Sequence, residues 1–469
     1  MKNTITVLIA LIYISLSQEI YTGYIIENTD TLDVFSYQIP SGYLDSNEHP
    51  ILVAFHQWGG NQDSPYSTSF DEEAELRNWI FLSPFGGSSN NYNHQEAQRY
   101  VELAILFLNE NFSIDQNRIY MVGGSMGGAS GSIYANNHLN PKKPMVAATA
   151  SASGILDCER RAIEMDGNNS MTEWFGGNWD EVPFEYHRNS AVYFADPTQS
   201  MHYNLQNTPL YLDFGITEPH RTHAEDLHNL LQGYNQNIWI DTEPTGSHGF
   251  SVIDENHACN WLSQYELVDD PDIINVNLDE PSRAYWIEAY NQFNNDDFIR
   301  INATRNETHY EIENVTNTDS LVLFNLNNEI ESFSISIQDS IYLGLTGSIL
   351  NYNYGYLNIE VSCPTFNDSC TAPFTYEIIN SIIWLDNECF NNSNLTSTDL
   401  GCNIVFEVDA YNDVNLDGIW NISDIIILIE FIINNQSPDN TNPLNGNMNL
   451  DSIVDILDII LIINMILED

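Results

Sequence analysis

Basic residues are scarce in this chain of 469 residues. Lysine and arginine together number 13 against 66 aspartates and glutamates, which gives a formal charge of −53 at pH 7. Nucleic acids and anionic membranes are bound through clustered positive charge, so this composition argues against both as partners. Hydrophobic residues nevertheless make up 43% of the chain and aromatic residues 12%. That content excludes a chain that is disordered throughout.

Cysteines are few, and none of the six has the spacing of a zinc ligand. We therefore expect oxidised pairs, as in other exported proteins. The spacing does not fix the pairing, although Cys158 and Cys259 form the only pair available in the first half. The second half holds Cys363, Cys370, Cys389 and Cys402.

No apolar run suits a membrane span. The run at residues 5–16 is too short to cross a bilayer, and the apolar runs near the C-terminus are interrupted by Asp and Glu. A single lysine precedes residues 5–16, and small residues follow at 15–17. This pattern predicts a signal peptide over residues 1–17 and a secreted or cell-surface protein.

Residues 18–265 alternate short apolar runs with helical patterns, which predicts an α/β domain with a mostly parallel, doubly wound sheet. Helices are expected at 96–109 and 223–231, and Thr222 with Glu225 resembles a capping box at the start of the second. The expected strands are 51–55, 79–82, 119–122, 145–152, 210–214 and 237–240.

Three further segments follow this α/β domain. Residues 266–350 contain runs with period-two alternation, which predicts a small antiparallel β domain. Residues 351–406 hold four cysteines among Asn, Ser and Thr, which suggests a linker or a stapled module. Residues 407–469 contain an internal repeat.

A Gly-x-Ser-x-Gly motif surrounds Ser125. A strand-like run at 118–122 precedes it, and a run of small residues at 128–135 with helical character follows. This order of strand, serine and helix is typical of a nucleophile elbow, where a serine stands exposed on a sharp turn. Ser125 is therefore the expected nucleophile.

A serine nucleophile needs a histidine to accept its proton and an acid to orient that histidine. Glu218 follows the strand at 210–214 and is the expected acid, with Asp213 as the alternative. His248 lies among small residues in the next loop and is the expected base. The competing histidines are His220, His223 and His228, which we expect on a solvated helix face and not at a metal site.

Catalysis at a serine also requires backbone donors for the oxyanion. The amide of Met126, directly after the nucleophile, is one expected donor. The loop at 56–61 follows an early strand, and its Trp58 amide is the expected second donor, with Gln57 as the alternative. His56 is expected to have a structural role at this turn, and the Trp58 ring is a candidate wall for the acyl group.

The segment 113–128, SIDQNRIYMVGGSMGG, resembles the signature of secreted esterases of the polyhydroxybutyrate depolymerase and feruloyl esterase type. PILVAFHQWGGN, GITE and GSHGF are similar to that family's oxyanion, acid and histidine segments, over about residues 20–265. The resemblance implies an α/β-hydrolase fold and ester hydrolysis through an acyl-enzyme, with no cofactor for catalysis. Two positions depart from the pattern, because Gln57 replaces a glycine and Glu218 replaces the more frequent Asp.

The expected substrate is a polymeric or polysaccharide-linked ester, such as a polyhydroxyalkanoate, a feruloyl or acetyl ester, or another polyester. An aromatic-rich insertion at 158–206 suggests either a platform for such esters or rings that pack the insertion onto the sheet. The alternatives are a serine peptidase of the prolyl-oligopeptidase type and a non-catalytic, tethered surface or scaffold protein.

The C-terminal repeat places oxygen-bearing side chains at positions 1, 3, 5, 9 and 12 of two loops, with a main-chain carbonyl at position 7. Gly418 supplies the sharp turn of the first loop. Such spacing surrounds Ca²⁺ with hard oxygen donors. The predicted ligands are Asp413, Asn415, Asp417, Ile419, Asn421 and Asp424, then Asn447, Asn449, Asp451, Ile453, Asp455 and Asp458.

Aspartate at position 12, followed by an apolar helix, resembles the duplicated dockerin type I module, over about residues 409–469. The resemblance implies a cohesin-like scaffold or cell-surface partner. The second loop departs from the pattern at Asn447 and at Ser452, which stands in place of glycine. We therefore expect it to bind calcium less tightly than the first.

Overall fold

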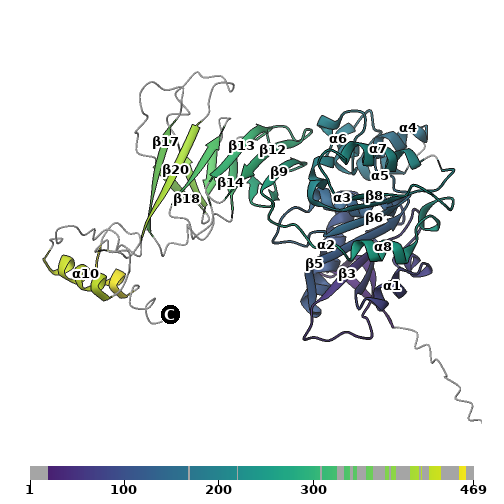
Figure 1. Cartoon of the computed structure of the whole chain (residues 1–469), viewed down its shortest axis with the longest axis horizontal. Coiled ribbons are helices and arrows are strands. Elements are labelled where there is room, and N and C mark those ends of the chain that lie inside the picture. The colour runs from purple at the N-terminus through teal and green to yellow at the C-terminus, as the bar shows by residue number, and fades with distance from the viewer. Residues whose placement is uncertain are drawn as a thin grey trace, which may run out of the picture. The chain divides into compact units, whose positions relative to one another are not determined.

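The computed structural model describes residues 19–166, 170–218, 220–306, 309–318 and 320–324. It also describes the strands 332–337, 342–345, 355–362, 375–379, 382–386 and 402–410, residue 414, the helix 422–434, and residues 454–460. The chain forms two compact units (Figure 1). The first comprises Met1–Tyr134, Pro144–Ala191 and Thr208–Leu267, and the second Ala135–Lys143, Val192–Asn207 and Val268–Asp469. The predicted signal peptide lies outside the described residues.

An eight-stranded mixed sheet with the order β1-β2-β4-β3-β5-β6-β7-β8 runs through the first unit. Strand β2 is antiparallel to both of its neighbours, and the strands from β4 to β8 are parallel to one another. The strands are β1 Ile20–Glu27, β2 Asp30–Gln38, β3 His49–Phe55, β4 Ile80–Pro84, β5 Ile114–Gly124, β6 Ala148–Ala152, β7 Leu210–Asp213 and β8 Ile238–Ile240. This is an α/β-hydrolase-like sheet.

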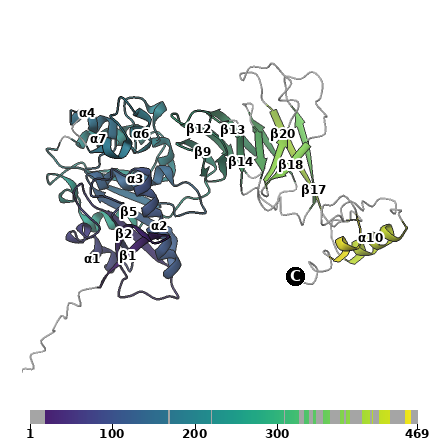
Figure 2. The same ribbon diagram turned by 180° about the vertical axis from the view of Figure 1, so that it is seen from behind.

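Helices cover both faces of this sheet, as the two opposite views show (Figure 1; Figure 2). Helices α1 (Phe70–Leu76) and α8 (Glu255–Leu262) share a core with side chains that alternate along the central strands, among them Leu52 and Ala54. Helices α2 (Gln95–Asn111) and α3 (Met126–Asn137) are long, and α7 (Arg221–Leu231) follows β7. The predicted doubly wound α/β architecture is confirmed for this unit.

The six expected strands are all present, and their register places the motif-bearing loops at one edge of the sheet. Because parallel strands end at the same edge, the loops after β3, β5, β7 and β8 converge there. The β1–β2 pair was not predicted. It is an antiparallel hairpin, and most side chains of β1 are exposed.

The described residues of the insertion after β6 form three short α-helices, α4 (Cys158–Glu164), α5 (Met171–Phe175) and α6 (Pro183–Arg188), followed by two 3-10 helices at Pro197–Gln199 and His202–Asn207. Phe175 and Tyr186 are buried in one cluster with Met126, and Trp174 and Trp179 pack against it half-buried. These rings therefore pack the insertion onto the unit, which was one of the two expectations for them.

The expected disulfide between Cys158 and Cys259 is absent, and this prediction was wrong. Both are buried free thiols. Cys158 packs with the insertion helices, whereas Cys259 is part of α8 and lies in the separate core that this helix shares with the sheet. Burial raises the pKa of each thiol to about 12, so both behave as small apolar side chains.

The described strands of the second unit form two six-stranded sheets with the orders β10-β11-β14-β16-β19-β18 and β17-β20-β15-β13-β12-β9. Their strands are β9 Ile273–Leu278, β10 Arg283–Ala284, β11 Ile287–Ala289, β12 Ile299–Arg305, β13 His309–Thr316, β14 Ser320–Leu323, β15 Ser332–Ile337, β16 Tyr342–Leu345, β17 Gly355–Ser362, β18 Thr375–Ile379, β19 Ile382–Asp386 and β20 Cys402–Ala410. The range 351–406, expected to be a linker or separate module, therefore supplies strands to the same sheets as 266–350.

Most pairings in these sheets are antiparallel, as predicted, but β13 pairs with β15 and β14 with β16 in parallel. Trp286 is fully buried beside Tyr310, with ring centroids 5.6 Å apart, and its indole N–H donates to the carbonyl of Pro271 at 2.7 Å.

Near the C-terminus, helix α10 (Ile422–Asn434) carries apolar residues from the first repeat copy. Ile425 and Leu428 from α10 pack with Val414 and with Ile459 from the second copy. The two copies therefore share one small core. Among the residues that the structure describes, no helix combines the length and apolar character needed to cross a bilayer.

Candidate active site

Ser125 occupies the sharp turn between β5, which ends at Gly124, and α3, which begins at Met126. Its φ of 55° lies in the left-handed region, which costs a non-glycine residue roughly 1–2 kcal/mol. Its amide donates to the carbonyl of Ala152 at 2.8 Å, which helps to hold the turn. A Cβ at Gly127 would lie 2.5 Å from the carbonyl oxygen of His56, so the second motif glycine permits a close backbone approach.

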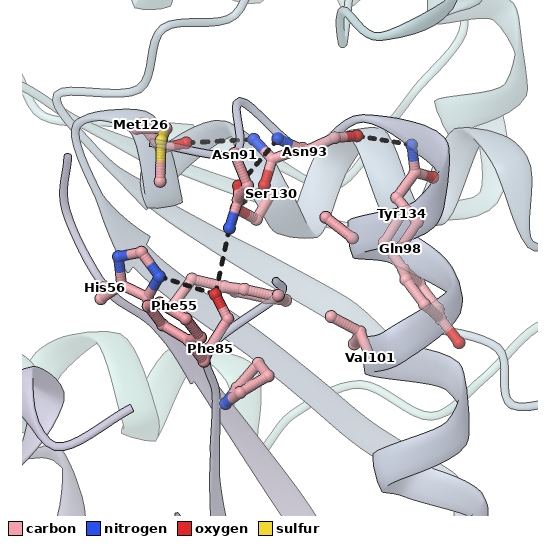
Figure 3. Close-up of a pocket in the computed structure, with 13 residues that line it drawn as sticks. Phe55, His56, Phe85, Asn91, Asn93, Gln98, Val101, Met126, Ser130 and Tyr134 are labelled. Atoms are coloured by element: carbon pink, nitrogen blue, oxygen red, sulfur yellow. Dashed lines mark hydrogen bonds between the residues drawn. The ribbon is translucent and has the colours of Figure 1, made fainter. Parts of the chain in front are cut away.

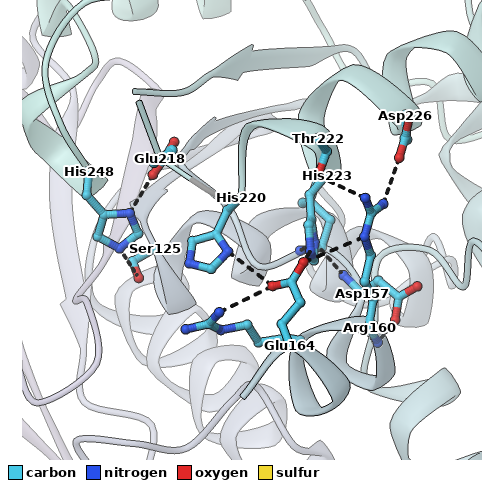
Figure 4. Close-up of polar contacts among 12 residues, drawn as sticks. Ser125, Asp157, Arg160, Glu164, Glu218, His220, Thr222, His223, Asp226 and His248 are labelled. Carbon is cyan, nitrogen blue, oxygen red and sulfur yellow. Dashed lines mark hydrogen bonds and ion pairs between the residues drawn. The ribbon is translucent and has the colours of Figure 1, made fainter. Parts of the chain in front are cut away.

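The loop after β8 brings His248 to this turn. His248 Nε2 lies 2.8 Å from Ser125 Oγ (Figure 4). His248 is extended, with φ of −170°, and precedes the short 3-10 helix at Gly249–Ser251. The hydroxyl of Ser251 accepts from the His248 amide at 3.2 Å and donates to the His248 carbonyl at 2.8 Å. The main chain of His248 is thus held in place by Ser251.

Glu218, after β7, lies on the other side of this ring. His248 Nδ1 is 2.5 Å from Glu218 Oε2, and the amide of Gly215 donates to Glu218 Oε1 at 2.6 Å. Burial by itself raises the pKa of this carboxyl, but hydrogen bonds from His248, Ser153 and Gly215 outweigh it, so the pKa is lowered overall. Glu218 is therefore a buried carboxylate that accepts a hydrogen bond from the Nδ1–H group of His248.

Asp213, the alternative acid, has a different partner. It is the last residue of β7 and is buried, and its side chain is hydrogen-bonded to that of Asp241. Burial and the neighbouring charge of Asp241 raise its pKa to about 7. The structure thus places Glu218, and not Asp213, against His248.

The two expected oxyanion donors lie in different settings. Met126 is the first residue of α3, so its amide is among the first-turn donors that have no partner within the helix. Trp58 lies in the loop after β3 with 58% of its surface exposed, and its indole N–H donates to Ser170 Oγ at 3.0 Å. His56 is buried below them, with ring nitrogens 2.8 and 2.9 Å from the carbonyls of Gln57 and Phe85. These contacts suit its predicted structural role.

The loop after β4 fixes Met126 and was not identified from the sequence. Asn93 Nδ2 donates to the Met126 carbonyl at 3.3 Å, and the Tyr92 amide lies 3.4 Å from the Met126 sulfur. Tyr92 and Asn93 both have positive φ. The hydroxyl of Ser130 donates to Asn93 Oδ1, and Gln98 Nε2 donates to the main-chain carbonyl of Asn93 at 2.8 Å. The asparagine-rich run at 90–93 was the available signal, since asparagine tolerates this backbone region.

A small cavity of about 20 Å³ lies among these residues, bordered by His56, Phe85, Asn93 and Met126 (Figure 3). This is room for about one water molecule. The cavity therefore lies among the residues that hold Met126 in place, and it is too small to hold a polymer or an acyl chain.

Gln57, which departs from the esterase pattern, fills space beside the histidine loop. A Cβ at Gly249 would lie 1.6 Å from Gln57 Oε1, and Gly249 also has φ of 61°. Because Gly249 has no side chain, the Gln57 carboxamide can occupy the space in which a Cβ would lie. The larger residue at 57 is accommodated by this glycine directly after His248.

His220 and His223 are buried, and the expectation of a solvated helix face was wrong. Helix α7 begins at Arg221 with His220 as its first flanking residue. The predicted capping box is also wrong, because Thr222 lies inside the helix and accepts from Arg160 Nη2 at 2.8 Å. The sequence pattern missed that α4 covers this end of α7.

Glu164, His220 and His223 have ligand atoms within 4.8 Å of one another, a spacing that could hold a metal ion. The protonation of His223 argues against it. His223 Nδ1 accepts from the amides of Leu156 and Asp157 at 3.2 and 3.3 Å, so the ring proton is on Nε2, which faces Glu164 at 3.7 Å. When a histidine binds a metal ion through one ring nitrogen, its other ring nitrogen carries the proton and donates a hydrogen bond. His223 has the opposite arrangement, because the proton is on the nitrogen that faces Glu164. The ion pairs of Glu164 are instead with Arg160 and Arg161, and the two histidines pack beside it.

Most of the predicted calcium ligands lie outside the described residues: Asp413, Asn415, Asp417, Ile419, Asn421, Asn447, Asn449, Asp451 and Ile453, together with the side chain of Asp424. Asp455 and Asp458 are described. Asp455 Oδ1 accepts from the Leu457 amide at 2.7 Å, and Asp458 Oδ2 accepts from the Asp455 amide at 2.8 Å. Asp455 thus caps the first turn of the helical residues 456–460 through the amide of its second residue, and Asp458 accepts from the Asp455 amide in return.

Comparison with known proteins adds the following. No family model and no curated protein matches the sequence. Among solved structures, FphF, a fluorophosphonate-binding serine hydrolase of Staphylococcus aureus, is 13% identical with a TM-score of 0.39, over 52% of this chain and 98% of that one. A ferulic acid esterase is 13% identical with a TM-score of 0.37, over 53% and 96%.

An acylaminoacyl peptidase of Pyrococcus horikoshii is 14% identical with a TM-score of 0.39, over 53% of this chain and 41% of that one. The α/β-hydrolase-like fold stated above rests on the strand order and the elbow, and not on these similarities.

Proposed function

We propose that this chain is a secreted serine esterase that hydrolyses carboxylic esters through an acyl-enzyme. One observation carries the proposal: a continuous hydrogen-bonded chain joins Ser125, His248 and Glu218. A serine on a strained elbow, a histidine in contact with its hydroxyl and a buried carboxylate behind that histidine are the parts that nucleophilic acyl transfer requires.

In the proposed reaction, Ser125 Oγ attacks the ester carbonyl as its proton passes to His248 Nε2. Glu218 stabilises the imidazolium and keeps the ring in the tautomer that presents Nε2 to the serine. The amides of Met126 and Trp58 are the proposed donors to the oxyanion. The tetrahedral intermediate then expels the alcohol, which takes the proton from Nε2.

Hydrolysis of the acyl-enzyme repeats these steps with water. His248 removes a proton from the water as it attacks the acyl carbonyl, and the same proton returns to Ser125 Oγ as the acid leaves. None of these steps requires a cofactor. The proposed substrates are polymeric or polysaccharide-linked esters, which the resemblance to polyhydroxybutyrate depolymerases and feruloyl esterases supports.

Covalent labelling tests this proposal. A fluorophosphonate probe should label the wild-type chain and leave Ser125→Ala unlabelled, and the same substitution should abolish turnover of p-nitrophenyl esters. Ser132→Ala, which removes another buried hydroxyl on α3, is the matched control and should still be labelled. Full ester turnover by Ser125→Ala would refute the proposal.

Substrate panels then separate the reaction classes. Release of acid from polyhydroxybutyrate, feruloylated xylan and acetylated xylan should exceed any cleavage of peptide amides. A preference for prolyl peptides would favour the peptidase alternative. Absence of both activities, together with absence of labelling, would favour the non-catalytic alternative.

For the C-terminal module we propose a calcium-dependent, dockerin-like role in tethering the enzyme to a cohesin-like scaffold or surface partner. The donor set supports it, since both loops offer only oxygen ligands. The shared core of Val414, Ile425, Leu428 and Ile459 also supports a paired arrangement of the two copies. EDTA should make this module sensitive to protease while p-nitrophenyl ester turnover is unchanged. A parallel loss of both would contradict separate roles.

A further inference from the structure

A row of three histidine rings leads from the proposed active site into the protein. The ring centroids of His248 and His220 are 5.5 Å apart at 60°, and those of His220 and His223 are 5.9 Å apart at 84°. The His248 side chain is 41% exposed, whereas His220 and His223 are buried. Figure 4 shows His220 between His248 and Glu164. The catalytic imidazole therefore packs against a buried ring.

His220 is uncharged at neutral pH. Burial is the main reason that its pKa is lowered to about 4, and the nearby Arg161, His223 and His248 act in the same direction, while Glu164 opposes them. His220 Nδ1 lies 3.5 Å from Glu164 Oε2. A carboxylate can only accept, so this contact favours the tautomer with the proton on Nδ1.

Glu164 is itself held from several sides. Its oxygens lie 3.2 Å from Arg161 Nη1, 3.8 Å from Arg160 Nε and 3.7 Å from His223 Nε2. Its contact with His223 is the main reason that its pKa is lowered to about 2, and the charges of His223 and His220 and a hydrogen bond from Arg161 act in the same direction. Glu164 is thus a carboxylate at any pH at which the enzyme is expected to work, and its negative charge lies beside the His220 ring.

We propose that His220 is a positioning residue for His248, an inference that rests on the proposed function. A half-exposed side chain can leave its productive rotamer, and catalysis requires His248 to contact Ser125 and Glu218 together. The buried ring of His220 restricts that movement. Its lack of charge also matters, because His248 becomes an imidazolium during the reaction and a second cation at this distance would oppose that change.

The test compares His220→Ala, which removes the ring, with His220→Phe, which keeps an uncharged ring. His220→Ala should lower kcat about tenfold with little change in KM, which corresponds to about 1.4 kcal/mol. His220→Phe should stay within about twofold of wild type. His228→Ala changes another histidine of the same helix and should leave kcat unchanged. Titration with a fluorophosphonate probe corrects each rate for the fraction of folded, reactive enzyme.

The pH profile of kcat/KM gives a second readout. If His220 is uncharged, the acid-limb pKa should be the same in wild type and His220→Phe. An upward change of more than about half a pH unit in His220→Phe would show that wild-type His220 carries charge, and would overturn the inference. Equal kcat in wild type and His220→Ala would also overturn it. Absence of ester turnover by the wild-type enzyme would instead refute the proposed function.

Discussion

Asp213 is the last residue of β7 and Glu218 lies in the loop that follows. Their environments predict opposite consequences of replacing each acid by its amide. A pKa of about 7 for Asp213, against the ordinary 3.8, corresponds to roughly 4 kcal/mol, because one pH unit is worth about 1.4 kcal/mol. This is an upper value, since local relaxation lessens the cost of a buried charge.

The sign of the effect on stability follows from the raised pKa. Below pH 4 Asp213 is protonated in both the folded and unfolded chains. Between pH 4 and 7 the unfolded chain releases this proton while the folded chain keeps it, so the free energy of unfolding falls as pH rises. Above pH 7 Asp213 has released its proton in both the folded and the unfolded chain, so its effect on the free energy of unfolding no longer changes with pH. Asn cannot titrate, and therefore Asp213→Asn should become progressively more stable than wild type from pH 4 to 7.

Thermal unfolding of the first unit, followed by near-UV circular dichroism, measures this difference. We expect equal Tm values near pH 4 and a Tm gain for Asp213→Asn of up to roughly 10 °C at pH 7 and above. Activity separates the two acids. Asp213→Asn should keep kcat within a few-fold, whereas Glu218→Gln should lose about 10³–10⁴, because an amide there favours the wrong imidazole tautomer.

Two results would refute this reasoning. One is a Tm difference between wild type and Asp213→Asn that does not change between pH 4 and 7. The other is the reverse order of activities, with Asp213→Asn inactive and Glu218→Gln active, which would make Asp213 the acid of the triad.

Two further predictions concern glycine and cysteine. Gly249→Ala should reduce kcat at least tenfold, because its Cβ would collide with Gln57; adding Gln57→Gly should recover only part, since the positive φ remains strained, and full activity of Gly249→Ala alone would contradict the packing described. Alkylation of the unfolded, unreduced chain followed by peptide mapping should find Cys158 and Cys259 both modified as free thiols, whereas a linked peptide pair would show that they are bonded.

The parallel part of the fold was predictable because buried parallel strands are short apolar runs between helical patterns. The β1–β2 hairpin was not, because β1 is an exposed edge strand whose side chains give little alternation. The positions of Ser125, Glu218 and His248 could be predicted from their order along the chain and from the sheet edge at which parallel strands end. Their hydrogen bonds required the structure.

Burial at the start of α7 could not be predicted from local sequence. His220 and His223 appear polar in the helical pattern, and only the packing of α4 against this end of α7 removes them from water. Asn93 is a similar case, since its contact joins the loop after β4 to Met126, the first residue of α3, which lies 33 residues away in sequence. Such contacts between distant segments are set by the fold, and a single sequence does not record them.

The second compact unit includes Ala135–Lys143 and Val192–Asn207, which precede its main segment in the chain. Asn204 exchanges two hydrogen bonds of 2.8 Å with Asn277, and the Tyr285 amide donates to the Leu139 carbonyl at 2.8 Å. A chain cut after Leu267 would lose these hydrogen-bond partners. Polar groups that are buried and paired in the full chain would then be left without a protein partner. The second unit therefore cannot be removed simply by truncating the chain. Shortening the protein to the first unit alone would require redesign of residues 135–143 and 192–207.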